Sequence, residues 1–196
     1  MRPLILASSS TYRQALLGRL GVPFASCAPD IDEQPHPGEA PLALVLRLAE
    51  AKARALAGRY PSHLIVGSDQ VAVLNRDGRE HLLGKPGSFE QARKQLTACS
   101  GQRVTFLTGV ALLDSASGEC QVDAVPFSVN MRLLEPAAIE RYLRAEQPYD
   151  CAGSFKAEGL GVSLFESTEG PDATSLVGLP LIRLVSMLAA AGVSIP

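Results

Sequence analysis

The sequence of 196 residues has no tryptophan and only 5% aromatic residues. It also lacks a long apolar run. After Arg2 the chain is apolar only over residues 4–7, and nowhere do about 18 apolar residues follow one another. A signal peptide and a membrane-spanning helix are therefore not expected, and we expect a cytoplasmic protein with no membrane partner.

Cysteine is scarce and widely spaced. Cys27, Cys99, Cys120 and Cys151 are the four cysteines, and no two stand in a Cys-x-x-Cys pattern. Zinc sites and disulfide frameworks use closer and more regular spacings. The pattern favours free thiols in a reducing compartment and argues against a thiolate-bound metal.

Charge of one sign is also missing. The formal net charge is -2, and lysine and arginine are spread along the chain without a basic stripe. Proteins that follow the backbone of long DNA or RNA concentrate positive charge on one surface. Long nucleic acid is therefore not an expected partner, whereas a small anionic substrate is compatible with the composition.

What the chain has in quantity is apolar residues, which make up 46% of it. That is enough to bury one substantial core, and we expect a single domain over residues 1–196. Residues 4–7 are expected to form a buried strand, residues 11–20 a helix and residues 24–28 another strand. Residues 28–41 contain four prolines and four carboxylates, which predicts a loop. Apolar residues at helical spacing then predict a helix over residues 42–56.

The remaining patterns alternate in the same way. Residues 64–67 predict a buried strand that ends at Ser68 and Asp69, residues 71–74 an extended segment, and residues 75–80 a turn. Ser88 is expected to cap a helix to residue 99, and residues 104–113 and 121–133 to form a long antiparallel hairpin. Helices are expected over residues 136–145 and 180–191. Hairpin and crossover patterns together predict an α/β fold with a mixed, elongated sheet flanked by helices.

The first turn after residues 4–7 carries three serines, Ser8, Ser9 and Ser10, followed by Arg13. A strand end that runs into a helix N-terminus offers backbone N-H groups to an anion, and the hydroxyls add further donors. Arg13 opposes the helix dipole but would gain from a phosphate. The alternative is that the serines only cap the helix and that Arg13 is solvated.

Asp69 follows an apolar run, a usual position for a catalytic group in an α/β protein. Glu33 in the acidic loop, Lys52 on the amphipathic helix and Lys85 in a Gly-Lys-Pro-Gly loop are candidate partners. Carboxylates and lysines around an anion site suit phosphoryl transfer with a divalent cation held by oxygen ligands. The alternative is that Asp69 caps a local turn and that each lysine lies on the surface.

Several motifs together resemble the Maf family, in family order and over nearly the whole chain. They are ILASSSTYRQALL at residues 5–17, AxxKA at 49–53, GSDQ at 67–70, GKP at 84–86, TG at 108–109, AGSFKAEG at 152–159 and LVGLPL at 176–181. The resemblance implies an inosine-triphosphatase-like fold. It also implies a cytoplasmic nucleoside triphosphate pyrophosphatase that uses Mg²⁺ or Mn²⁺ to cleave between the α and β phosphates.

The resemblance also implies roles for individual residues. Asp69 would be the general base and, with Glu33, a metal ligand. The expected triphosphate-binding residues are Ser8, Ser10, Arg13, Lys52 and Lys85. The family often forms dimers, so a homodimer is a possible assembly.

Two positions depart from the common family pattern and bear on specificity. Thr11 and Tyr12 replace a Pro-Arg pair, which leaves Arg13 alone for phosphate, and Glu158 stands where the pyrimidine-cleaving branch has glutamine. Both resemble the 7-methyl-GTP branch. An aromatic face at Tyr12 would stack on the cationic methylated ring, and a carboxylate at Glu158 would accept the two donors of guanine.

Gln70 in the GSDQ motif is expected to contribute to specificity as well. 7-Methyl-GTP is therefore the expected substrate. Three alternatives stay open: other noncanonical nucleotides, the pyrimidine triphosphates dTTP and UTP, and a nucleotide-binding regulator of cell division without catalysis.

Overall fold

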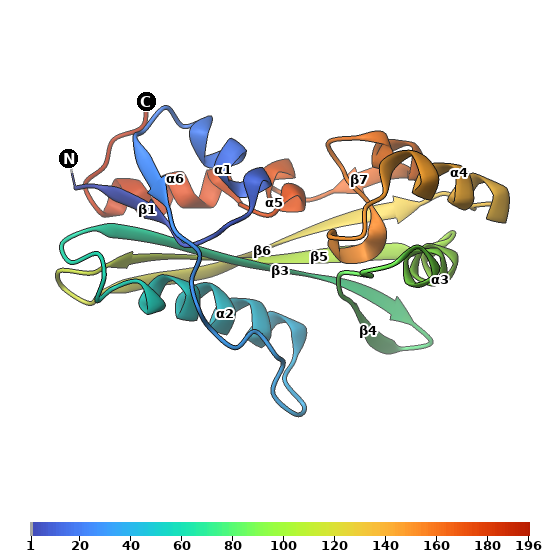
Figure 1. Cartoon of the computed structure of the whole chain (residues 1–196), viewed down its shortest axis with the longest axis horizontal. Helices are drawn as coiled ribbons and strands as arrows, with labels where there is room; N and C mark the ends of the chain where they lie inside the picture. Colours follow the sequence, from blue (N-terminus) through green and yellow to red (C-terminus); the bar gives the residue numbers. More distant parts are fainter. Residues whose placement is uncertain (1) are drawn as a thin grey trace. The chain divides into compact units, whose positions relative to one another are not determined.

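The computed structural model describes residues 2–196 (Figure 1). The chain groups into two compact units. The first contains residues up to 70, residues 108–125 and residues 172–196; the second contains residues 71–107 and 126–171. The strands β3 (Leu64–Arg76), β5 (Arg103–Asp114) and β6 (Cys120–Met131) each contribute residues to both units. A single domain over residues 1–196 stays a prediction.

The strands form one seven-stranded mixed sheet. Its order is β2-β1-β3-β5-β6-β7, and β4 pairs with β3. The strand β1 (Leu4–Leu6) is parallel to both β2 (Phe24–Ser26) and β3. The strand β4 (Arg79–Leu83) is antiparallel to β3, and β7 (Phe165–Glu169) is antiparallel to β6. The prediction of an α/β fold with a mixed sheet is confirmed.

In the first unit, helices cover both faces of the sheet. The helix α2 (Pro41–Ala55) lies on one face, and α1 (Thr11–Gly18), α5 (Ala173–Val177) and α6 (Leu181–Ala190) lie on the other (Figure 1). Successive strand residues point to opposite faces. Leu4 and Leu6 of β1 therefore pack in the core with α1 and α6, while Ile5 packs in the core with α2.

Two glycines let α2 approach the sheet closely. A Cβ at Gly67 on β3 would overlap the carbonyl oxygen of Ala49 and lie 2.9 Å from the backbone nitrogen of Ala53. A Cβ at Gly109 on β5 would overlap the carbonyl oxygen of Val45 and lie 2.7 Å from its carbonyl carbon. Because both clashes involve helix backbone, no side-chain movement relieves them. Only glycine permits this contact.

The predicted end of a strand at Ser68 and Asp69 is wrong, because β3 continues without a break to Arg76. A buried strand can continue through polar residues when their side chains find hydrogen-bond partners within the protein. Here the hydroxyl of Ser68 donates to the carbonyl oxygens of Gly109 at 2.8 Å and Gly178 at 2.9 Å. Asp69 has its own partner on α2. Asp69 therefore lies within a long strand and not in a turn.

The second unit contains α3 (Phe89–Cys99) and α4 (Pro136–Glu146). The predicted cap is confirmed, since the Ser88 hydroxyl accepts from the backbone N-H of Gln91 at 3.3 Å. Two short 3-10 segments, η1 (Ala152–Ser154) and η2 (Leu160–Leu164), follow α4. The sequence patterns did not predict these segments, nor β4 and β7. The turn before β4 has φ of 54° at Asp77 and 69° at Gly78, the geometry of a two-residue hairpin.

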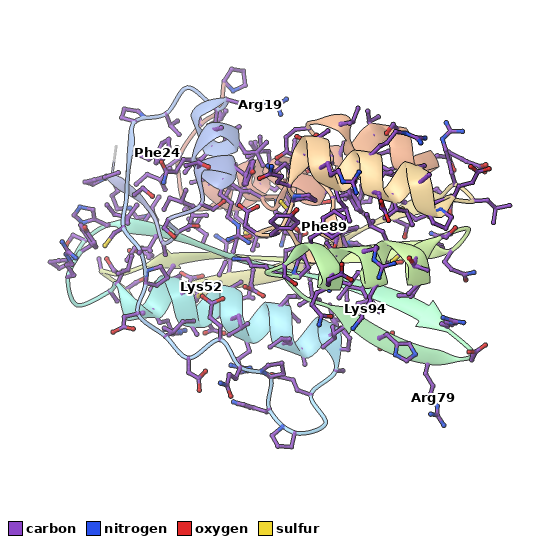
Figure 2. The ribbon with its side chains drawn as sticks, turned by 45° about the vertical axis from the view of Figure 1, so that its right-hand side comes forward. Arg19, Phe24, Lys52, Arg79, Phe89 and Lys94 are labelled. Carbon is purple, nitrogen blue, oxygen red and sulfur yellow. The ribbon has the colours of Figure 1, made fainter. Side chains whose placement is uncertain are left out.

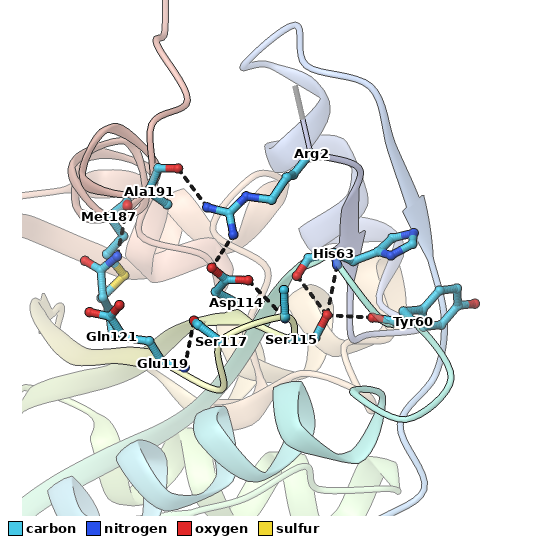
Figure 3. A network of polar contacts seen from close by, with 11 residues as sticks. Arg2, Tyr60, His63, Asp114, Ser115, Ser117, Glu119, Gln121, Met187 and Ala191 are labelled. Carbon is cyan, nitrogen blue, oxygen red and sulfur yellow. Dashed lines mark hydrogen bonds and ion pairs between the residues drawn. The ribbon is translucent and has the colours of Figure 1, made fainter.

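A polar network joins distant segments of the first unit (Figure 3). Arg2 pairs with Asp114 at the end of β5 and also donates to the carbonyl oxygen of Ala191 at 3.1 Å. The Arg2 hydrogen bond holds the pKa of Asp114 below its usual value. The hydroxyl of Ser115 accepts from the His63 N-H at 2.9 Å and lies 2.6 Å from the Tyr60 carbonyl oxygen. These contacts tie the residues before β1 and β3 to the turn between β5 and β6.

All four cysteines are free. No helix within residues 2–196 has the length and apolar character needed to cross a membrane. The cytoplasmic location stays a prediction.

The close approach of α2 to the sheet can be tested by its effect on stability. We expect Gly67→Ala to lower the free energy of unfolding by about 1 to 3 kcal/mol or more, because the added methyl group must push helix backbone away from the sheet. Gly58→Ala is the matched control, since a Cβ there meets nothing within 4 Å and Gly58 has no positive φ. Urea denaturation measures both. Equal stability of the two variants would contradict the tight contact.

Candidate active site

Lys52 is the centre of a buried ionic cluster. Its ammonium nitrogen donates to the Asp69 carboxylate at 2.7 Å and to the Glu33 carboxylate at 2.9 Å. The side chains of Lys52 and Asp69 are only 5% and 9% exposed, whereas Glu33 is 56% exposed. Lysine and aspartate are rarely buried unless they are paired. Asp69 is therefore the buried carboxylate of the cluster, and Glu33 is the solvent-exposed one.

The fold explains how these residues meet. Lys52 lies in the last turn of α2, between Ala49 and Ala53, the two residues whose backbone contacts Gly67. Asp69 lies two residues after Gly67 on β3, so its side chain points to the same face of the sheet as α2. Figure 2 shows Lys52 on the helix beneath the sheet. The loop before α2 supplies Glu33.

Arg13 adds a second cation near this cluster. Its Nε donates to the carbonyl oxygen of Gly178 at 2.8 Å, which fixes the guanidinium against the turn after α5. Burial lowers the pKa of Arg13 from its ordinary value, and the charges of Asp69 and Glu33 oppose this shift. Arginine remains protonated in proteins, so Arg13 stays a cation close to both carboxylates.

Ser8 and Ser10 organise the turn that enters α1. The Ser8 hydroxyl accepts from the Ser10 backbone N-H at 3.1 Å, and the Ser10 hydroxyl caps α1 by accepting from the Arg13 N-H at 3.4 Å. Ser26 donates to the carbonyl oxygen of Ser8 at 2.6 Å. The capping role is thus present, and each hydroxyl keeps its own hydrogen as a donor.

Gln70 holds a neighbouring segment in place. Its side-chain nitrogen donates to the Thr108 hydroxyl at 2.9 Å and to the carbonyl oxygen of Ser175 at 2.7 Å. The Thr108 hydroxyl donates to the same carbonyl oxygen at 2.9 Å. Gln70 therefore anchors α5 to the sheet, and its expected role in specificity stays a prediction.

The remaining predicted residues are Tyr12, Lys85 and Glu158. Tyr12 is half-buried in the first turn of α1. Lys85 and Glu158 belong to the second unit, Lys85 in the loop before α3 and Glu158 between η1 and η2, and both are exposed. Their roles in binding phosphate and base stay predictions.

Four buried polar residues of the first unit received no role from the sequence: Ser68, Thr108, Asp172 and Ser175. Each is buried and hydrogen-bonded. Asp172 caps α5 through the Thr174 N-H at 2.8 Å and accepts from the Ile182 N-H at the start of α6, also at 2.8 Å. The Asp-x-Thr spacing is a helix-cap signal that could have identified Asp172. Ser68 and Thr108 depend on partners far away in the chain, whereas the Ser175 hydroxyl donates to the nearby carbonyl oxygen of Asp172 at 2.6 Å.

No group of three or more His, Cys, Asp and Glu side chains converges anywhere in residues 2–196. The cluster instead provides two carboxylates, Glu33 and Asp69, that converge on one cationic group. Mg²⁺ commonly binds through one or two carboxylates together with substrate phosphate oxygens. The donor set therefore fits a metal that arrives with a phosphorylated substrate, and does not fit a cage made only of protein ligands.

The fold has a counterpart among solved structures. The structure of a HAM1 protein from Coxiella burnetii matches 97% of this chain and 100% of its own, with a TM-score of 0.51 and 14% sequence identity. At this identity the likeness concerns the fold alone. The chain therefore shares the α/β architecture of that protein.

The sequence comparisons identify the family. The model for Maf-like proteins matches residues 3–191, and the chain belongs to the Maf family. Among curated proteins, it is 68% identical to a 7-methyl-GTP pyrophosphatase of Pseudomonas fluorescens Pf0-1 and 69% identical to one of Pseudomonas syringae pv. tomato. Both matches cover all of each chain.

The buried pair generates a prediction about stability. Lys52→Met should lower the free energy of unfolding by about 3 to 5 kcal/mol, because it leaves the Asp69 carboxylate buried without its cationic partner. Arg54→Met is the matched control on the same helix, since Arg54 pairs with Glu50 on the surface and such pairs contribute little. Thermal and urea unfolding measure both. Similar stabilities would show that Asp69 does not depend on Lys52.

Proposed function

We propose that this chain is a nucleoside triphosphate pyrophosphatase that converts 7-methyl-GTP into 7-methyl-GMP and pyrophosphate. The observation that carries the proposal is the full-length identity of 68–69% to proteins named for this activity. The ionic cluster of Lys52, Asp69, Glu33 and Arg13 supports it, because hydrolysis of a triphosphate needs a base and cations in one place.

Asp69 is the proposed general base. Its carboxylate is almost fully buried on a rigid strand and is oriented by the 2.7 Å hydrogen bond from Lys52. One carboxylate oxygen is held by the ammonium group, so the other can accept a proton from the attacking water. The water oxygen then bonds to a phosphorus atom, and the bridging bond between the α and β phosphates breaks to release pyrophosphate.

We expect the phosphates to bind to the cationic side chains and to the turn that precedes α1. Arg13 can contribute its terminal nitrogens, since only Nε is engaged by Gly178. The hydroxyls of Ser8 and Ser10 and the N-terminus of α1 add donors that favour an anion. Lys85 is the further proposed phosphate ligand.

We also propose a divalent cation, Mg²⁺ or Mn²⁺, held by Glu33 and Asp69. The cluster contains two cations and two carboxylates, so a bound triphosphate would bring excess negative charge. When bound, the metal would supply the missing positive charge and polarise the phosphate oxygens. Lys52 would then hold both carboxylates in position from the protein side.

Recognition of the base is assigned to Tyr12 and Glu158. A cationic methylated guanine gains about 0.5 to 2 kcal/mol on an aromatic face. Its two adjacent donors suit a carboxylate, which would repel the carbonyl oxygens of a pyrimidine. Exposure of Glu158 leaves its carboxylate accessible to a ligand.

The first catalytic prediction concerns Asp69. Asp69→Asn keeps the shape of the side chain but removes the base, so release of pyrophosphate from 7-methyl-GTP should fall at least about 10²-fold at saturating Mg²⁺. Asp30→Asn, at an exposed position in the acidic loop, is the control and should retain full turnover. Near-normal turnover of a folded Asp69→Asn protein would exclude Asp69 as the base.

The second concerns selectivity. Glu158→Gln should reduce cleavage of 7-methyl-GTP by about 10- to 100-fold relative to UTP, because the amide offers one acceptor where the carboxylate offers two and a charge. Glu166→Gln, an exposed residue on β7, is the control. A nucleotide panel containing 7-methyl-GTP, GTP, dTTP and UTP provides the measurement. An unchanged ratio would place base selection elsewhere.

A further inference from the structure

Side chains of the helix α4 accept hydrogen bonds from the backbone on both sides of Glu158. The backbone N-H of Lys156 donates to the hydroxyl of Tyr142 at 3.0 Å, and the backbone N-H of Leu160 donates to the carboxylate of Glu146. Tyr142 and Glu146 both belong to α4. The two anchored amides lie two residues before and two residues after Glu158.

Tyr142 and Glu146 are four residues apart, so they project from the same face of α4, one turn from each other. The Tyr142 side chain is buried at 3% exposure, which fixes its hydroxyl. Lys156 reinforces the grip, because its ammonium donates to the carbonyl oxygen of Glu146 at 3.3 Å. A rigid helix thus provides two anchor points at a defined spacing.

Between the anchors the backbone forms a compact turn. The carbonyl oxygen of Lys156 accepts from the N-H groups of Gly159 at 3.2 Å and Gly161 at 3.1 Å. A Cβ at Gly159 would lie 3.0 Å from the carboxylate carbon of Glu146, and one at Gly161 would lie 2.8 Å from the carbonyl carbon of Lys156. The glycines therefore let the turn close tightly, and Glu158 lies within it as an exposed residue.

Charged groups near this turn affect the pKa values of Tyr142 and Cys151. Burial raises the pKa of Tyr142, and the charges of Glu146, Cys151 and Glu158 raise it further, while the hydrogen bond from Lys156 opposes the shift. The hydroxyl of Tyr142 therefore stays neutral. Glu158 also contributes, after burial and Asp150, to raising the pKa of Cys151 to about 12.

We propose that Tyr142 and Glu146 are positioning residues that hold the backbone on both sides of Glu158, so that its carboxylate has one orientation for the base. This inference rests on the proposed role of Glu158 in selecting 7-methyl-GTP. It assigns no contact with the substrate to Tyr142 or Glu146. Their effect on selectivity acts only through Glu158.

The test compares variants that remove one anchor at a time. Tyr142→Phe keeps the buried ring but removes the acceptor, and Glu146→Ala removes the carboxylate. Each should lower the ratio of kcat/KM for 7-methyl-GTP to kcat/KM for UTP by about tenfold, the effect of one lost hydrogen bond to a well-placed group. UTP cleavage itself should be unchanged.

Two variants serve as controls. Glu146→Gln keeps an acceptor oxygen for the Leu160 N-H and should retain most of the ratio. Glu140→Ala removes a carboxylate from the same helix that pairs only with Arg144 at 3.1 Å, and should retain all of it. Thermal unfolding of each variant checks the fold. Hydrogen exchange at the Leu160 amide, faster in Glu146→Ala than in Glu140→Ala, reports the anchor without catalysis.

Combination with Glu158→Gln separates positioning from general structural damage. If the anchors act through Glu158, adding Tyr142→Phe or Glu146→Ala to Glu158→Gln should lower the ratio no further. Additive losses, or equal losses on both substrates, would overturn the inference. A ratio lowered by Glu158→Gln but unchanged by the anchor variants would overturn the positioning role alone. A ratio unchanged by Glu158→Gln would overturn the role of Glu158 and the inference with it.

Discussion

The backbone contact between α2 and the sheet is the constraint on which the candidate active site depends. Gly67 and Gly109 have no side chains, so the helix can lie against the strands where any larger residue would collide with Ala49, Ala53 or Val45. The close approach of α2 to the sheet brings the ammonium nitrogen of Lys52 to 2.7 Å from the Asp69 carboxylate. A helix held farther out would leave both charges buried without partners, at a cost of several kcal/mol.

The same contact orders the charges around the proposed phosphate site. Lys52 neutralises the buried Asp69, and its second hydrogen bond reaches outward to Glu33, which is 56% exposed. Arg13 is fixed by Gly178 and keeps terminal nitrogens for a ligand. The two cations and two carboxylates of the cluster therefore balance in the free protein. A bound triphosphate would add negative charge, which the proposed divalent cation would offset.

Much of the secondary structure could be predicted because it depends on neighbours in the chain. Helical spacing identified α2, Ser88 and Pro136 marked the starts of α3 and α4, and alternation identified the hairpin of β5 and β6. The end of β3 was predicted wrongly, because local polarity does not reveal that Ser68 is satisfied by Gly109 and Gly178. The segments β4, β7, η1, η2 and α5 are short and have weak periodicity, so packing decides them.

The sequence by itself determined the family, through motifs spread over nearly the whole chain, and the candidate residues Arg13, Lys52 and Asp69 within them, with Glu33 in the acidic loop. It also determined the order of the main helices and strands, since propensity, capping and periodicity act over a few residues. Only the tertiary structure decided which charges pair, because Lys52 meets Asp69 and Glu33 through a helix contact that no local pattern encodes. The hold of Tyr142 and Glu146 on the Glu158 segment likewise joins residues 14 apart, and it exists because α4 places both side chains on one face.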